Sequence, residues 1–158
     1  LSLSVSPQIL LGCLLILPGR SAARCLNATE LQRSQQRLER TSWTFPHVTT
    51  PQHAPTCAQV AEMLPKDTAG RSLSPWSYRL DRDDNRFPHE IPVAKCLCEG
   101  CIINQREDVN YNSKPVFVWR NVLRKEPCPG DPTRVQVSKE KFKVAVACTC
   151  VWPENVRR

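Results

Sequence analysis

The cysteines constrain the fold of this chain more than any other residue type. Two clusters lie far apart in the sequence, at 96–101 (Cys-Leu-Cys-Glu-Gly-Cys) and at 148–150 (Cys-Thr-Cys). In an extended strand successive side chains point to opposite faces, so Cys148 and Cys150 would present both sulfur atoms on one side. The clusters can therefore cross-link two hairpins at one place, as disulfides, as metal ligands or as reactive thiols.

An apolar run near the N-terminus predicts export. Residues 9–17 are almost entirely apolar and are followed by Pro18-Gly19 and by the small residues Ser21-Ala22-Ala23. The run is too short to cross a bilayer, which takes about 20 apolar residues, and it precedes a small-residue cleavage site. We expect residues 1–23 to be a signal peptide cleaved after Ala23, with a truncated start because an initiator Met and a basic n-region are missing.

Cleavage would remove Cys13 and leave eight of the nine cysteines. An even number of cysteines in an exported chain predicts a disulfide framework. The net charge of +7 is not gathered in a long Lys/Arg tract, which favours solubility and weak attraction to anionic cell surfaces over nucleic-acid binding. We expect a secreted, extracellular protein with no membrane insertion and no nucleic-acid partner. Asn27-Ala28-Thr29 is an acceptor sequence that predicts glycosylation of Asn27.

Residues 24–71 carry little regular pattern, and we expect an irregular N-terminal arm there. A short polar helix is predicted within 26–40, with Thr29 as its N-cap. A second short helix is predicted from Cys57 to Leu64, ended by Pro65, because proline cannot continue a helix.

Strand patterns begin after this arm. Residues 76–80 alternate apolar with polar side chains and, with 90–96, predict a first hairpin around a charged turn. Pro92 has no amide hydrogen, so its strand should lie at a sheet edge. Strands at 114–125, 134–137 and 142–152 form a second, longer hairpin. Such thin ribbons are marginal alone, whereas a disulfide closing a loop of this size adds roughly 4 to 5 kcal/mol in the chain-entropy model.

Two other cysteine chemistries, zinc binding and thiol catalysis, fit the sequence less well than disulfides. A zinc site with four cysteine ligands departs from the usual C-x2-C spacing and from an oxidising export route. Thiol catalysis is disfavoured because Cys98-Glu99-Gly100-Cys101 opens no helix pattern, and we expect no enzyme activity, cofactor or metal. The other groups that catalysis would need lie in loop-like or turn sequence: His47, His53, His89, Asp81, Asp83 and Asp84.

Several short motifs together resemble the signature of the interleukin-17 cytokines, in order and spacing across about 72–152. They are Ser72-Leu73-Ser74-Pro75-Trp76-Ser77-Tyr78, Asp81 to Arg86, Pro88, Ala94-Lys95-Cys96, Gly100-Cys101-Ile102, Asn112-Ser113 and Cys148-Thr149-Cys150-Val151. The additional Cys98 gives the pattern Cys-Leu-Cys-Glu-Gly-Cys, which is similar to that of the B, C and E members more than to that of the A and F members. The sequence from Arg24 to Leu31 and the position of Cys57 resemble the C-type member.

This resemblance implies an all-β, cystine-knot-like fold of two long antiparallel hairpins, in a domain covering 72–158. It implies bonds between Cys96 and Cys148 and between Cys101 and Cys150, with Ser74 and Ser113 where a full knot would carry a third disulfide. The four remaining cysteines allow three connectivities. From the family we favour Cys57 with Cys98 in one chain, and Cys25 with Cys128 of a partner chain.

The resemblance further implies a pro-inflammatory cytokine, acting as a disulfide-linked homodimer on single-pass interleukin-17-type receptors. Uncovered apolar surface on thin ribbons is typical of an interface, and Val116, Val118 and Trp119 lie on such a ribbon. Aromatic and arginine side chains dominate interface energetics, so the candidate receptor or dimer contacts are Trp76, Tyr78, Arg82 and Arg86. For Trp76 the Ser-Pro-Trp motif favours core or dimer packing over receptor contact, and Arg82 and Arg86 are equally compatible with a solvated turn. The alternative from another class is a secreted cationic, cystine-rich antimicrobial or matrix-binding protein.

Overall fold

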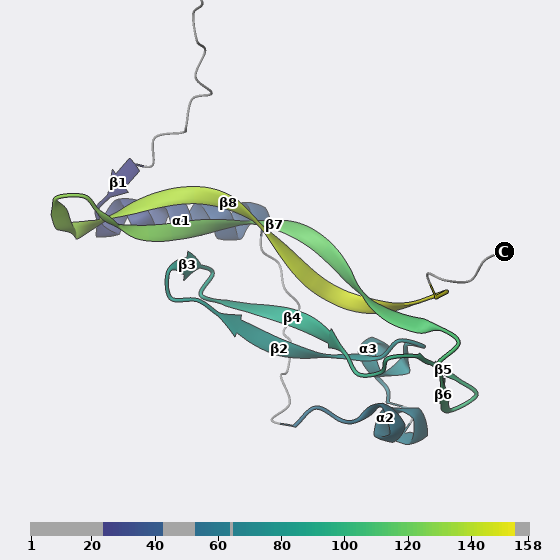
Figure 1. Ribbon diagram of the computed structural model, residues 1–158. Helices are drawn as coiled ribbons and strands as arrows, with labels where there is room; N and C mark the ends of the chain where they lie inside the picture. Colours follow the sequence, from purple (N-terminus) through teal and green to yellow (C-terminus); the bar gives the residue numbers. More distant parts are fainter. Residues whose placement is uncertain (1–23, 43–52, 64, 154–158) are drawn as a thin grey trace, which may run out of the picture.

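A computed structural model describes residues 24–42, 53–63 and 65–153 of the chain (Figure 1). The signal peptide predicted at 1–23, the residue His47 and the end of the predicted domain at 154–158 lie outside the described residues.

A long, twisted two-stranded ribbon is the largest element of the fold. Strand β7 (Asn112–Cys128) pairs antiparallel with β8 (Asp131–Val151), and Gly130 supplies the positive φ of 77° at the turn between them. Short strands flank the ribbon on both edges, β1 (Arg24–Leu26) beside β8 and β3 (Arg86–Phe87) beside β7. The ribbon therefore forms the centre of a four-stranded sheet.

The prediction of two separate strands at 134–137 and 142–152 was wrong. Residues 138–141 continue β8 without a break, because each of them pairs with a residue of β7, from Ser138 with Arg124 to Lys141 with Asn121. Charged residues obscured this pairing in the sequence. They are tolerated because Lys139, Glu140 and Lys141 are exposed to solvent.

The first hairpin forms where the alternation predicts it. Strand β2 (Trp76–Arg82) pairs antiparallel with β4 (Glu90–Cys96) as a separate two-stranded sheet. Pro92 pairs with Leu80 and, as predicted, lies in an edge strand, because β4 has only one neighbour. Figure 1 shows this hairpin lying along the β7–β8 ribbon.

The apolar core lies between the hairpin and the ribbon. Ile91 of β4 is fully buried against Val122 of β7 and Val144 of β8. Four partly buried side chains, Val93, Val118, Phe142 and Val146, extend this cluster. The strands and the four disulfides confirm the predicted all-β, cystine-knot-like fold.

Helix α1 (Ala28–Ser42) covers one end of the ribbon. Its N-cap is Asn27, so the prediction of Thr29 as the N-cap was wrong. The Asn27 side-chain oxygen accepts from the Glu30 amide at 2.9 Å, and the Asn27 amide donates back to the Glu30 carboxylate at 3.2 Å. This reciprocal pair is a capping box. The buried side chain of Leu38 anchors the helix.

Two short helices and one small hairpin lie toward the other end of the ribbon (Figure 1). Helix α2 (Cys57–Met63) confirms the predicted second helix, and the one-turn α3 (Thr68–Arg71) follows it. Strands β5 (Cys101–Ile103) and β6 (Arg106–Asp108) pair with each other, and β6 contacts α2.

Candidate functional site

Two disulfides tie the end of β4 and the start of β5 to one segment of β8. Cys96 bonds Cys148 with their Cα atoms 5.7 Å apart, and Cys101 bonds Cys150 with a Cα separation of 5.9 Å. These are the pairs that the resemblance implied. The bonds and the chain between them close a ring that fixes the first hairpin to the ribbon.

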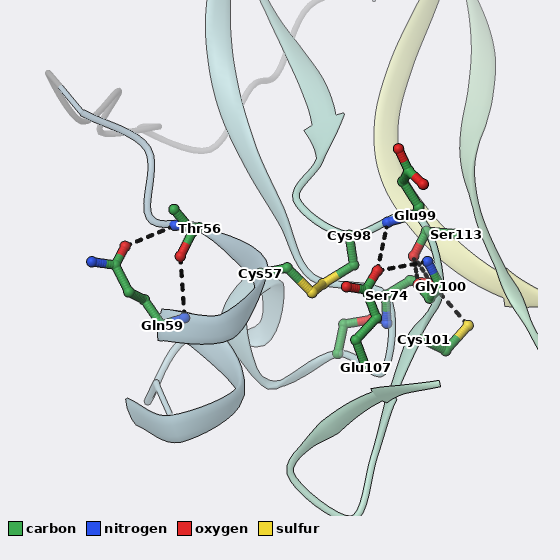
Figure 2. Close-up of a disulfide and its surroundings, with 11 residues drawn as sticks. Thr56, Cys57, Gln59, Ser74, Cys98, Glu99, Gly100, Cys101, Glu107 and Ser113 are labelled. Carbon is green, nitrogen blue, oxygen red and sulfur yellow. Dashed lines mark hydrogen bonds between the residues drawn. A yellow bond between two sulfur atoms is a disulfide. The ribbon is translucent and has the colours of Figure 1, made fainter. Parts of the chain in front are cut away.

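A hydrogen-bonded pair of serines occupies the place of a third knot disulfide. The Ser74 and Ser113 hydroxyl oxygens lie 2.8 Å apart, and the Ser113 hydroxyl donates to the Gly100 carbonyl at 2.6 Å (Figure 2). Because Ser113 uses its proton on Gly100, Ser74 must be the donor in the serine pair. Ser74 is fully buried, with its oxygen 3.8 Å from the Cys101 sulfur.

The loop between Cys98 and Cys101 is held by an acceptor from the neighbouring hairpin. The Glu107 carboxylate accepts from the Glu99 amide at 2.9 Å and from the Gly100 amide at 2.8 Å (Figure 2). Gly100 is required here because a Cβ would collide with the Asp108 carbonyl. The backbones of the ring and of β6 therefore approach too closely for any side chain.

Cys98 does not belong to the ring. It bonds Cys57, the first residue of α2, with the Cα atoms 4.9 Å apart (Figure 2). This is the favoured pairing, and it fastens the N-terminal arm to the end of the first hairpin. Glu107 lies close to both sulfur atoms, but a bonded pair offers no thiolate to a metal.

Cys25 was predicted to bond Cys128 of a second chain. In the structure the two cysteines bond each other within one chain, with their Cα atoms 5.9 Å apart. Strand β1 pairs with β8 so that Cys25 lies opposite Gln136, which in turn pairs with Glu126, two residues before Cys128. The strand pairing thus brings the two cysteines together. All eight cysteines from Cys25 onward are bonded.

Two of the predicted contact residues, Tyr78 and Trp76, are partly buried within the chain. The Tyr78 hydroxyl donates to the Val146 carbonyl at 2.9 Å, so its polar end is turned inward. Trp76 lies opposite Cys96 and is partly buried, and in the described part of the chain its indole nitrogen is enclosed without a hydrogen-bond partner. Both side chains pack within the chain, with some surface left exposed.

Arg86 was wrongly predicted as a surface contact, because it is 2% exposed. Its guanidinium donates to the Asp81 carboxylate at 2.7 Å and to the Asp81 carbonyl at 2.8 Å, and it lies 4.5 Å from the centre of the Phe142 ring. These partners offset the cost of burying the charge. Arg82 is exposed, with an ion pair to Glu90 at 2.8 Å.

The tip of the first hairpin is fixed to the ribbon by charge. The Arg124 guanidinium donates to the Asp83 carboxylate at 2.7 Å, and the Lys125 amide donates to the Asn85 carbonyl at 2.7 Å. The Asn85 amide, first, and the Arg124 guanidinium hold the pKa of Asp83 below its usual value. Asp83 therefore stays ionised and positions the turn.

One apolar surface of the ribbon stays largely exposed in the described part of the chain, where only the Lys143 ammonium lies over it, 4.2 Å from the centre of the Phe117 ring. Phe117, Trp119 and Leu123 occupy alternate positions of β7 and so lie on one face. Helix α1 packs over Leu123, which is 8% exposed, but Phe117 and Trp119 remain 47% and 63% exposed. We call Phe117 and Trp119 the aromatic face. The sequence indicated Trp119, whereas Phe117 was missed although its alternation with Trp119 was visible.

The fold and the disulfide pattern define an all-β protein with a cystine-knot-like centre in which a serine pair replaces one bond. The sequence model of the interleukin-17 family matches residues 72–152, so the chain belongs to the interleukin-17 family. Interleukin-17C of Mus musculus is 41% identical over 104 residues, which are 61% of this chain and 54% of that protein. Interleukin-17C of Homo sapiens is 41% identical, over 60% and 52% of the two chains.

Other family members are also similar. Interleukin-17F of Rattus norvegicus is 44% identical over 57% of this chain and 55% of that protein. The chain spans about half the length of the curated relatives that it matches. The relatives agree with the predicted likeness to the C-type member.

No helix in the described ranges combines the length and apolar character needed to cross a membrane.

Proposed function

We propose that this chain is a secreted, pro-inflammatory cytokine with no catalytic activity, which acts as a homodimer that brings interleukin-17-type receptor chains together. Membership of the interleukin-17 family supports the cytokine class. The four disulfides support an oxidising export route. Bonded cysteines also argue against the thiol and zinc alternatives, because both need free thiolates.

The aromatic face is the observation that carries the homodimer. Phe117 and Trp119 lie two residues apart on β7, on the same face, and both are exposed. Contiguous exposed aromatic surface on a small protein marks an interface. A two-fold dimer brings the same surface of both chains together, so one patch can cover itself. A second copy of this chain is therefore the occupant that we propose.

The proposed dimer is not covalent. Each cysteine from Cys25 onward is bonded within the chain, so a bond between chains would have to replace one of these four disulfides. The Cys25–Cys128 bond instead holds β1, and with it the start of α1, at the end of the ribbon. Packing of the aromatic faces supplies the association.

Arg82 remains the best receptor contact among the predicted residues. It projects from the outer end of β2 and its side chain is 71% exposed, whereas Arg86 is buried. Arginine is enriched among residues that carry binding energy, and its ion pair with Glu90 is exposed and costs little to break. Receptor binding at this end of the first hairpin would leave the aromatic face free for the second copy.

Receptor binding tests the proposal. The chain is passed over immobilised ectodomains of interleukin-17-type receptors, with Arg82→Glu as the variant. Arg106→Glu is the matched control, because Arg106 is also exposed and the charge change is the same. We expect binding by the unmodified chain, a loss of about tenfold or more for Arg82→Glu and little change for the control. Absence of binding to every such receptor, or activity that persists after reduction and unfolding, contradicts the proposal.

A further inference from the structure

Helix α1 carries a stripe of arginines that the receptor proposal does not use. Arg33, Arg37 and Arg40 are exposed and lie at spacings of four and three residues. At 3.6 residues per turn these spacings place all three within about 60° of one another around the helix. The stripe, which we call the arginine stripe, runs for roughly 10 Å along the helix axis.

These arginines do not hold the fold together. Leu38 is the buried side chain of α1 and packs on the ribbon, on a different side of the helix from the stripe. Within the part of the chain that the structure describes, the guanidinium groups of the stripe form none of the ion pairs. Three solvent-exposed positive charges thus lie in one row and remain available to a partner.

The two acidic residues of α1 do not neutralise the arginine stripe, because one is bonded to other groups and the other lies on a different side of the helix. Glu30 accepts from the Arg24 guanidinium at 3.0 Å and from the Asn27 amide at 3.2 Å, so its charge is already matched. Glu39 lies roughly 120° around the helix from Arg33. The potential along the stripe is therefore positive, with little local cancellation.

The surface around the stripe is hollowed. Arg37 lines three hollows, of about 350, 310 and 430 Å³, which adjoin one another because they share this side chain. Arg33 and Arg40 both line the 310 Å³ hollow. Lys139 of β8, a further exposed cation, lines the 430 Å³ hollow. The 310 Å³ hollow is lined by all three guanidinium groups of the stripe and no acid, whereas Glu30 also lines the 350 Å³ hollow. The concave surface between these guanidinium groups suits anionic groups.

We propose that the arginine stripe binds sulfated glycosaminoglycan chains, with Arg33, Arg37 and Arg40 as the principal contacts and Lys139 at its side. The guanidinium fork matches the oxygens of sulfate and carboxylate groups. A narrow row of charges fits a linear polymer that repeats its anions along its length, rather than a flat membrane. The disulfides favour an extracellular setting, where such polymers are found.

The test measures binding of a heparin octasaccharide at several NaCl concentrations. The variant is Arg33→Gln/Arg37→Gln/Arg40→Gln, in which glutamine keeps the helix propensity. The matched control is Arg79→Gln/Lys95→Gln/Arg106→Gln, which removes the same charge from exposed positions on other elements. Circular dichroism checks that both variants remain folded.

We expect the stripe variant to bind at least about tenfold more weakly at 0.15 M NaCl, because three charge-assisted contacts to the polyanion are lost. The slope of log K against log [NaCl] should fall by about 2, because fewer counterions are released. The control should retain nearly all of its affinity. Equal losses in both variants would show that only net charge matters and would overturn the proposal.

Three further probes separate the source of the anion. Desulfated heparin should bind much more weakly than heparin, and double-stranded DNA and phosphatidylserine vesicles should bind no more tightly than heparin. Tighter, stripe-dependent binding to DNA or to the vesicles would overturn the assignment to glycosaminoglycans. None of these measurements involves a receptor, so the result is independent of the proposed cytokine activity.

Discussion

The hydroxyl oxygens of Ser74 and Ser113 lie 2.8 Å apart and form a directed chain, in which Ser74 donates to Ser113 and Ser113 donates to the Gly100 carbonyl. This chain joins the start of β7 to the disulfide ring without a covalent bond. Removing the Ser74 hydroxyl therefore leaves no buried donor without a partner, whereas removing the Ser113 hydroxyl leaves the Ser74 hydroxyl without its acceptor.

Ser113→Ala should destabilise the protein more than Ser74→Ala. Loss of the Ser74 hydroxyl removes one hydrogen bond, at about 0.5 to 1.5 kcal/mol, and leaves Ser113 still bonded to Gly100. Loss of the Ser113 hydroxyl strands the buried Ser74 hydroxyl, which raises the cost to about 1 to 3 kcal/mol. Urea unfolding of both variants under non-reducing conditions measures the difference. The reverse order would refute the assigned donor direction.

Arg86→Ala should destabilise the chain by about 3 kcal/mol, because it removes a buried cation from Asp81 and from the Phe142 ring. Arg82→Ala is the matched control, since its ion pair with Glu90 is exposed and is worth at most about 1 kcal/mol. Denaturant midpoints give both values. Similar midpoints for the two variants would mean that Arg86 does not carry the structural role assigned to it.

Cys57→Ala/Cys98→Ala should release α2 while the ribbon stays folded. The bond closes a separation of 41 residues, and loops of this size contribute about 4 kcal/mol in the chain-entropy model. Hydrogen exchange should therefore show lost protection at residues 57–63 and unchanged protection in the paired parts of β7 and β8. Loss of protection throughout the ribbon would contradict a bond that only fastens the arm.

Acidification should weaken the attachment of the first hairpin tip. The pKa of Asp83 is lowered in the folded state, so its stabilising effect is present above the unfolded value of 3.8 and is lost as the pH falls through the folded value. The free energy of unfolding should thus decrease below about pH 4. Asp83→Asn should flatten this dependence between pH 7 and pH 3. An unchanged pH profile in the variant would contradict the role of Asp83.

The sequence predicts where strands form better than it predicts where helices and strands begin and end, or which side chains contact one another. Alternation within 76–80 and the missing amide of Pro92 depend on local chemistry, so the first hairpin forms where it was expected. The N-cap was also local, but Asn27 and Thr29 are both good capping residues. The capping box between Asn27 and Glu30 was the signal that decides between them.

The burial of Arg86 could not be predicted from its neighbours. Its turn is charged and resembles solvated sequence, whereas its enclosure depends on Phe142, which is 56 positions away. The exposure of Phe117 and Trp119 has a similar origin, because it depends on where α1 ends over the ribbon. Such long-range packing leaves no local pattern.

The central claim, a non-covalent homodimer joined through the aromatic face, is tested most directly by the solution mass of the chain. Light scattering after size-exclusion chromatography compares the unmodified chain with Phe117→Ser/Trp119→Ser. Leu73→Ser/Val109→Ser is the matched control, since those side chains are 54% and 74% exposed elsewhere. We predict a dimer for the unmodified chain and the control, a monomer for the aromatic-face variant, and monomer bands for all three on a non-reducing denaturing gel. A monomeric unmodified chain, or a dimer that survives in the aromatic-face variant, would contradict the account.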